Sequence, residues 1–127
     1  MTALFRRIQP SKKLRITVRS IAQMLKIPQN QIKRVESWVN VVFVHRRDKG
    51  GQFLSYRRLQ EWQNAIAYQI QTSSNLSELS QLATSIKQDS RKFKKQYCQQ
   101  ALDFLRRMCI QRQDTLESWE NLNSCAS

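Results

Sequence analysis

Near the start of the chain, apolar residues recur on one side of a helical repeat. Val18, Ile21, Ala22 and Leu25 share this side, and Thr17 precedes them where an N-cap hydroxyl accepts a free backbone amide. The pattern predicts a short helix that ends near Leu25.

A second helix is expected to begin at Pro28, because the first turn of a helix does not need the amide that proline lacks. Its inner side would bury Ile32 and Val35. Its outer side would present the polar and basic residues Gln29, Asn30, Lys33 and Arg34. The two helices, separated by two residues, predict a helix-turn-helix, a motif that places its second helix in the major groove of DNA.

After Trp38 the pattern changes to that of a β-strand. Residues 41–44 form a β-branched and aromatic run, and both glycines of the chain follow at positions 50 and 51. This arrangement predicts a two-stranded hairpin, or wing, with Trp38 packing it against the second helix. The wing is expected to contact phosphates through Arg46, Arg47 and Lys49.

The second half of the chain has the pattern of three more helices. Ser55 can cap a helix that runs to about Gln71, and Asn75 with Glu78 forms a capping box for a helix that ends near Gln88. Residues 90–122 contain neither Gly nor Pro, which predicts one long helix.

One stripe of this long helix has the three- and four-residue spacing of a coiled-coil seam. Its members are Cys98, Leu102, Leu105, Cys109, Leu116 and Trp119, with Arg112 as the polar interruption. Since the stripe is longer than the head can cover, we predict a homodimer formed by a second copy of the chain. Cys98 and Cys109 are interpreted as buried structural thiols, and Cys125 as part of a short tail.

The expected fold is mainly α, with a winged helix-turn-helix head and a long C-terminal dimerisation helix. We expect one cooperative unit in 127 residues. Its parts are a basic N-terminal arm over residues 1–15, the head over residues 16–72, a connecting helix over residues 73–89, and the dimerisation helix with its tail over residues 90–127.

Positive charge is concentrated in the first half of the chain. The net charge is +13, of which residues 1–58 hold +12 and residues 59–127 hold +1. A solvated basic surface on an ordinary domain would spread its charge, whereas a nucleic-acid surface concentrates it. We therefore expect nucleic acid as the partner.

Several function classes are excluded by composition. Two glycines and one histidine, His45, cannot build a Gly-rich phosphate loop, a dinucleotide fingerprint or a two-histidine zinc helix. We expect no enzyme activity, no cofactor and no metal, and we interpret His45 as a strand residue near phosphate. Three widely spaced cysteines, the lack of a signal peptide and short apolar runs predict a soluble cytoplasmic protein without membrane contact.

The order of these elements resembles the MerR family of bacterial transcription regulators. The stretch from Leu25 to Glu36 is similar to the recognition-helix signature of the family, and Gly50 to Leu59 is similar to its wing and third helix. The resemblance implies a dimer on double-stranded DNA whose recognition helices enter successive major grooves of a near-palindromic promoter site. Residues implied in DNA contact are Arg19, Gln29, Asn30, Lys33, Arg34, Arg46, Arg47, Lys49, Arg57 and Arg58.

The chain departs from this family at four positions of the signature. Where the family usually has Gly, Arg and two aromatic residues, this sequence has Lys26, Lys33, Arg34 and Val35. Almost nothing follows Leu122, so we expect no effector domain and no small-molecule effector. The size and architecture also resemble the small MerR-type repressors that accompany type V-K CRISPR-associated transposon systems, which implies a target promoter that drives the CRISPR effector or its RNAs. Since no sensing module is expected, we predict an effector-independent repressor.

Two other functions stay open. An excisionase-like architectural protein would share the winged head and bend DNA. An RNA-binding accessory protein would also be basic and helical, but the sequence shows no exposed aromatic sheet of the kind that single-strand readers use.

Overall fold

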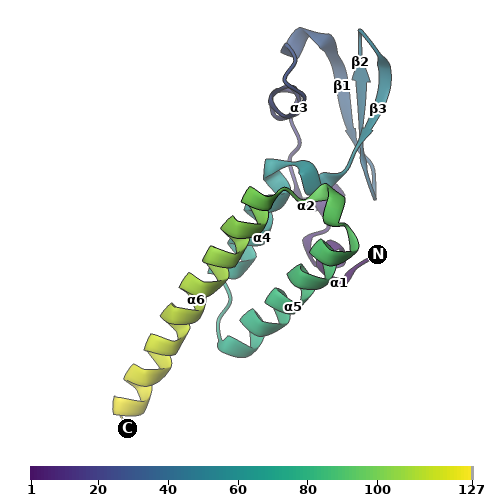
Figure 1. Ribbon diagram of the computed structural model, residues 1–127. Coiled ribbons are helices and arrows are strands. Elements are labelled where there is room, and N and C mark those ends of the chain that lie inside the picture. The colour runs from purple at the N-terminus through teal and green to yellow at the C-terminus, as the bar shows by residue number, and fades with distance from the viewer. Residues whose placement is uncertain (127) are drawn as a thin grey trace. The chain divides into compact units, whose positions relative to one another are not determined.

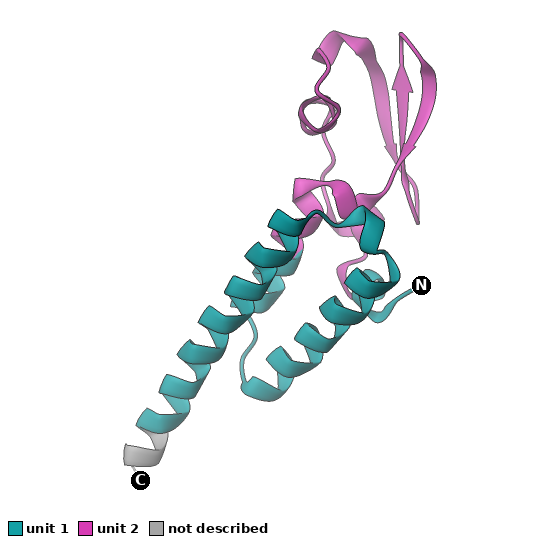
Figure 2. Cartoon of the chain, in the orientation of Figure 1, with its two compact units in different colours: residues 1–6, 66–127 teal, residues 7–65 magenta. Residues whose placement is uncertain are grey.

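Helices make up most of the chain, together with one three-stranded antiparallel sheet and a long C-terminal helix, which confirms the mainly helical class. The computed structural model describes the backbone of residues 1–126 and the side chains of residues 1–122. Two units are distinguished (Figure 2): unit 1 comprises residues 1–6 and 66–127, and unit 2 comprises residues 7–65.

The sheet of unit 2 is built around its central strand, β2 (Val42–Arg46). Strands β1 (Ile32–Ser37) and β3 (Gly50–Leu54) pair with its two edges, both antiparallel (Figure 1). Val42 and Val44 are fully buried, because alternate residues of a strand point to the same face. One face of the sheet therefore belongs to the core of unit 2.

The predicted second helix is wrong. Gln29–Gln31 form a single 3₁₀ turn, η1, and the residues that follow are strand β1. Pro28 has an extended backbone with a ψ of 146°, so it does not begin a helix. The spacing of Ile32 and Val35 fits a helix locally, but both residues are β-branched, and pairing with β2 satisfies the backbone groups of both strands. The unit is therefore not a helix-turn-helix with a two-stranded wing.

The first predicted helix is confirmed as α3 (Val18–Leu25). The Thr17 hydroxyl accepts the Ser20 amide at 3.1 Å, as expected for an N-cap. The helix ends at Lys26, whose backbone is left-handed with a φ of 58° and whose amide donates to two carbonyls of the last turn. A lysine thus occupies a conformation that favours glycine.

The N-terminal residues that were expected to form a basic arm are helical. They form α1 (Ala3–Ile8) and α2 (Pro10–Lys13), and Leu4 and Phe5 are buried. These apolar side chains give the segment a packing role that its charge pattern did not indicate.

The predicted third helix begins later than expected. Ser55 accepts the Arg57 amide and so caps a 3₁₀ turn, η2 (Tyr56–Arg58), rather than the helix itself. The helix α4 spans Gln60–Gln71, and its end at Gln71 agrees with the prediction.

In unit 1, α5 (Leu76–Lys92) begins with the predicted capping box. Asn75 accepts the Glu78 amide at 2.9 Å, and the Glu78 carboxylate accepts the Ser74 amide at 2.8 Å. The helix continues four residues beyond the predicted end at Gln88.

The predicted continuous helix over residues 90–122 is also wrong at its start. Between α5 and α6 (Gln99–Ala126) the chain turns through η3 (Lys94–Gln96), and α5 and α6 pack side by side (Figure 1). The carboxylate of Asp89, fully buried, accepts hydrogen bonds from the hydroxyls of Tyr97 and Thr2. The bond from Tyr97 closes the turn over eight residues and the bond from Thr2 comes from the other end of the chain, and together they fix the turn where no Gly or Pro marks it.

We predict that Lys26→Gly stabilises the protein by about 1 kcal/mol, because glycine adopts the left-handed conformation without the steric cost of a Cβ atom. Urea unfolding measures the change. Lys26→Ala is the control, since it removes the charge and keeps the Cβ. An equal gain from Lys26→Ala would show that charge, not backbone conformation, is responsible.

Candidate nucleic-acid interface

The face of the sheet opposite Val42 and Val44 carries aromatic and charged side chains. The register of β2 places Phe43 between Glu36 and Phe53, and His45 between Arg34 and Gly51. We name this surface the open face, formed by Arg34, Glu36, Trp38, Phe43, His45 and Phe53. This exposed aromatic sheet surface was not expected from the sequence.

Three aromatic rings gather at one end of the open face. Trp38 stacks on Phe43 with ring centroids 5.3 Å apart and planes 16° apart. Phe53 meets Trp38 and Phe43 edge-on, at centroid distances of 5.4 and 4.9 Å. Trp38 is 46% exposed and Phe53 57% exposed. Two large rings of the cluster therefore remain accessible to a ligand.

A hydrogen bond from a buried side chain fixes the turn that carries Trp38. The Trp38 amide donates to the Val41 carbonyl at 3.0 Å, and the hydroxyl of buried Tyr56 donates to the Trp38 carbonyl at 2.5 Å. Burial raises the pKa of Tyr56, so this hydroxyl stays protonated as a donor. Trp38 was expected to pack a wing against a helix, but it lies on the open face instead.

The two glycines have different roles. Gly50 has a φ of +74°, which agrees with the predicted turn. Gly51 lies under the ring of Phe43, where a Cβ atom would overlap that ring. The missing side chain of Gly51 is thus what lets Phe43 lie flat on the sheet.

The other end of the open face is polar. His45 donates to the Glu36 carboxylate, and Arg34 lies 3.8 Å from the same group. The hydrogen bond from His45, and then the positive charge of Arg34, hold the pKa of Glu36 below its ordinary value. Glu36 is therefore a carboxylate at neutral pH, with basic groups on either side of it.

The three residues predicted to contact phosphates at the hairpin end, Arg46, Arg47 and Lys49, lie in two different environments. Arg46 donates to both oxygens of Asp48, at 3.0 and 2.8 Å, and to Gln52 at 2.9 Å, and its side chain is only 8% exposed. The guanidinium of Arg46 therefore binds groups of the hairpin itself. Arg47 donates to the Asn30 carbonyl at 3.0 Å but stays exposed, as does Lys49.

The remaining predicted contacts are spread over unit 2. Lys33 and Arg34 are exposed on β1, and Gln29 and Asn30 are exposed in η1, instead of sharing one helix. Other predicted residues lie near the start of α4. Arg19 and Arg58 line a hollow of about 510 Å³ together with Glu61, which accepts a hydrogen bond from Ser20, and Arg57 lies over the Trp62 ring at 5.4 Å.

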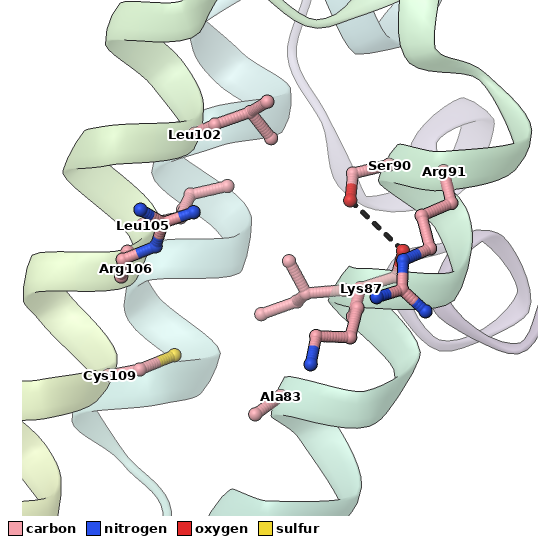
Figure 3. Close-up of a pocket in the computed structure, with 9 residues that line it drawn as sticks. Ala83, Lys87, Ser90, Arg91, Leu102, Leu105, Arg106 and Cys109 are labelled. Carbon is pink, nitrogen blue, oxygen red and sulfur yellow. Dashed lines mark hydrogen bonds between the residues drawn. The ribbon is translucent and has the colours of Figure 1, made fainter.

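A groove between α5 and α6 lies within unit 1 and includes part of the predicted dimer seam (Figure 3). Its volume is about 320 Å³. Apolar side chains face each other across it, among them Ala83 of α5 and Leu105 of α6, and three cations lie along it: Lys87, Arg91 and Arg106. No salt bridge neutralises these cations among residues 1–122.

The predicted seam residues do not share one environment. Leu105 and Leu116 are each 2% exposed within the chain, Leu102 and Cys109 are half-buried, and Cys98 is exposed. The interpretation of Cys98 as a buried thiol is wrong. Burial raises the pKa of Cys109, which makes its thiol a poor nucleophile at neutral pH. Cys125 lies outside the side chains that the structure describes.

Farther along α6, the polar interruption of the seam has its own partners. Arg112 donates twice to the Ser73 carbonyl, at 3.1 and 2.7 Å, and its guanidinium lies 4.9 Å from the centre of the Trp119 ring. Trp119 nevertheless stays 49% exposed. Arg112 thus ties α6 to the loop before α5.

No protein-family model, curated protein or solved structure matches the chain. The resemblance to MerR regulators stays a prediction, and the recognition helix on which it depended is replaced by β1. Within the described part of the chain, no helix is long and apolar enough to cross a membrane. The described residues also contain no group of three or more His, Cys, Asp or Glu side chains that could hold a metal ion.

We predict that Gly51→Ala destabilises unit 2 by about 1–3 kcal/mol, because the added Cβ forces the Phe43 ring off the sheet. Urea unfolding measures the loss. In a Phe43→Leu background the smaller side chain leaves room, so the same substitution should cost less. An equal cost in both backgrounds would contradict the role assigned to Gly51.

Proposed function

We propose that this chain is a nucleic-acid-binding protein and that unit 2 supplies the binding surface. Unit 2 has thirteen Lys and Arg residues against three acids, a net charge of +10, whereas unit 1 has nine against six. A polyanion is the partner that such a concentration of positive charge favours. This asymmetry is the observation that carries the proposal.

The acids of unit 2 do little to neutralise its exposed cations. Glu36 is bound by His45 and lies 3.8 Å from one exposed cation, Arg34. Asp48 is bound by Arg46, and Glu61 accepts a hydrogen bond from the Ser20 hydroxyl. Other basic side chains stay exposed around the sheet, notably Lys33, Arg34, Arg47 and Lys49. These four can reach phosphates without first breaking a buried ion pair.

We do not propose that a recognition helix binds duplex DNA, because residues 28–35 contain only η1 and part of β1. The open face and the hairpin end take its place as the candidate contact surface. Regulation of transcription, and the role of an effector-independent repressor in the cytoplasm, stay predictions.

We also propose a homodimer, with the far end of α6 from one copy lying in the groove of the other. The groove combines apolar side chains with three cations. The far end of α6 combines the exposed apolar residues Trp119 and Leu122 with the exposed acids Asp114, Glu117 and Glu120. Because each copy carries both surfaces, two copies can satisfy each other in a closed two-fold arrangement.

The binding proposal predicts that replacing Lys33, Arg47 and Lys49 together with Ala weakens binding to all nucleic acids. A variant that makes three fewer phosphate contacts releases fewer counterions when it binds, so the magnitude of the slope of log affinity against log salt should fall by about 2 to 3. Fluorescence anisotropy with labelled DNA and RNA over a salt series measures both effects.

The matched control replaces three exposed cations of unit 1, Lys92, Lys94 and Lys95, with Ala. It should leave the affinity and the slope close to those of the wild type. If the wild type binds neither DNA nor RNA at low salt, the proposed function is wrong.

The dimer proposal predicts that Arg106→Glu raises the dimer dissociation constant by about tenfold or more, since it places a like charge against the acids of α6. Adding Glu117→Lys in the same chain should restore part of the association, because one pair of opposite charges is regained while Glu120 stays opposite in charge to Lys87 and Arg91. Sedimentation equilibrium measures it, with Lys95→Glu as the control outside the groove. A wild-type monomer at micromolar concentration would refute the dimer.

A further inference from the structure

Resting on the proposed function, we propose that the open face binds unpaired nucleobases by stacking them on Trp38 and Phe53, so that the ligand is a single strand. The first observation is exposure. Trp38 and Phe53 are 46% and 57% exposed, and their rings, with centroids 5.4 Å apart, form an apolar patch on the more basic unit of the chain. An apolar patch of this kind marks a binding surface, and aromatic rings beside cations match bases beside phosphates.

The angle between the rings favours a single strand over a duplex. The planes of Trp38 and Phe53 differ by 70°. Two neighbouring bases that stack on these rings cannot stay stacked on each other, as they must in a double helix. In a duplex the faces of the bases are also hidden, and only their edges reach the grooves. The open face therefore suits bases that are already unstacked.

Cations stand where the backbone of such a strand would pass. Arg34 extends from the open face with a side chain that is 67% exposed, and Arg47 and Lys49 are exposed at the hairpin end of the same sheet. The one acid of the open face, Glu36, is bound by His45 and faced by Arg34, which offsets its repulsion of phosphate. Stacking and charge are thus provided on one surface.

The cluster is also fixed before any ligand arrives. The Tyr56 hydroxyl holds the turn that carries Trp38, and Gly51 lets Phe43 support the tryptophan ring from below. A rigid aromatic surface loses little conformational freedom when a base stacks on it.

The test uses the full chain with three labelled probes of about 12 nucleotides: oligothymidine, oligouridine and the duplex of oligothymidine with oligoadenosine. Anisotropy gives the affinities at one salt concentration. We expect both single strands to bind more tightly than the duplex. The comparison of oligothymidine with oligouridine separates DNA from RNA as the source of the strand.

The variants separate stacking from charge. Trp38→Ala and Phe53→Ala should each weaken single-strand binding by roughly 5- to 100-fold, with a small effect on the salt slope. Trp38→Phe keeps a stacking ring and should retain most of the affinity. Tyr68→Ala is the matched control, because it removes an aromatic residue that is 67% exposed on α4, and should bind like the wild type. Circular dichroism shows whether each variant is folded. If Trp38→Ala does not fold, the test depends on Phe53→Ala.

The outcomes distinguish this inference from the proposed function. If the duplex binds best and folded aromatic variants bind like the wild type, stacking is overturned while nucleic-acid binding stands. If no probe binds the wild type, both are overturned. If Trp38→Ala changes the sedimenting mass and leaves the affinity for the oligonucleotides unchanged, the open face is a protein contact and the inference is wrong.

Discussion

The need of the central strand for a partner on each edge determines most of unit 2. β2 carries two fully buried valines, and its backbone groups can be satisfied in the core only by strands on both sides. The hairpin supplies β3, and the segment after η1 supplies β1. Once β1 is paired, Trp38 falls in the turn between β1 and β2, and Arg34 and Glu36 fall on the face away from the core. The chemistry of the open face is thus a consequence of strand pairing.

Signals that lie within a few residues of each other were sufficient to predict much of the fold. The Thr17 cap, the turn at Gly50, the end of α4 and the Asn75 capping box all depend on local hydrogen bonds or backbone angles. The errors occurred where hydrogen bonds to another segment of the chain decide the conformation. β1 is a strand because β2 lies beside it, and the chain turns between α5 and α6 where Asp89 binds Tyr97 and Thr2. A helical spacing of apolar residues, or a stretch without Gly and Pro, does not register such partners.

The candidate site was predictable in its charge and not in its shape. Counting charges located the basic half of the chain, and most of the named cations are exposed. Arg46 and Arg57 are the exceptions, because the sequence does not show that Asp48 and Gln52 bind Arg46 or that Arg57 lies over the Trp62 ring. The aromatic cluster joins residues from two strands and a turn, and only the register of the sheet brings Trp38 and Phe53 within 5.4 Å. The alternation from Val42 to His45 was the one available signal, since it separates a valine face from an aromatic face.

This alternation also affects how the protein can change over evolutionary time. Along β2, alternate residues have different roles. Val42 and Val44 pack in the core, whereas Phe43 and His45 lie on the face that solvent and ligands can reach. A lineage can therefore exchange Phe43 or His45 for other side chains while Val42 and Val44 keep the sheet folded. New ligand preferences can arise in this way while the valine face of the strand stays unchanged. Gly51 sets the limit of that freedom, because any side chain placed there displaces the ring above it.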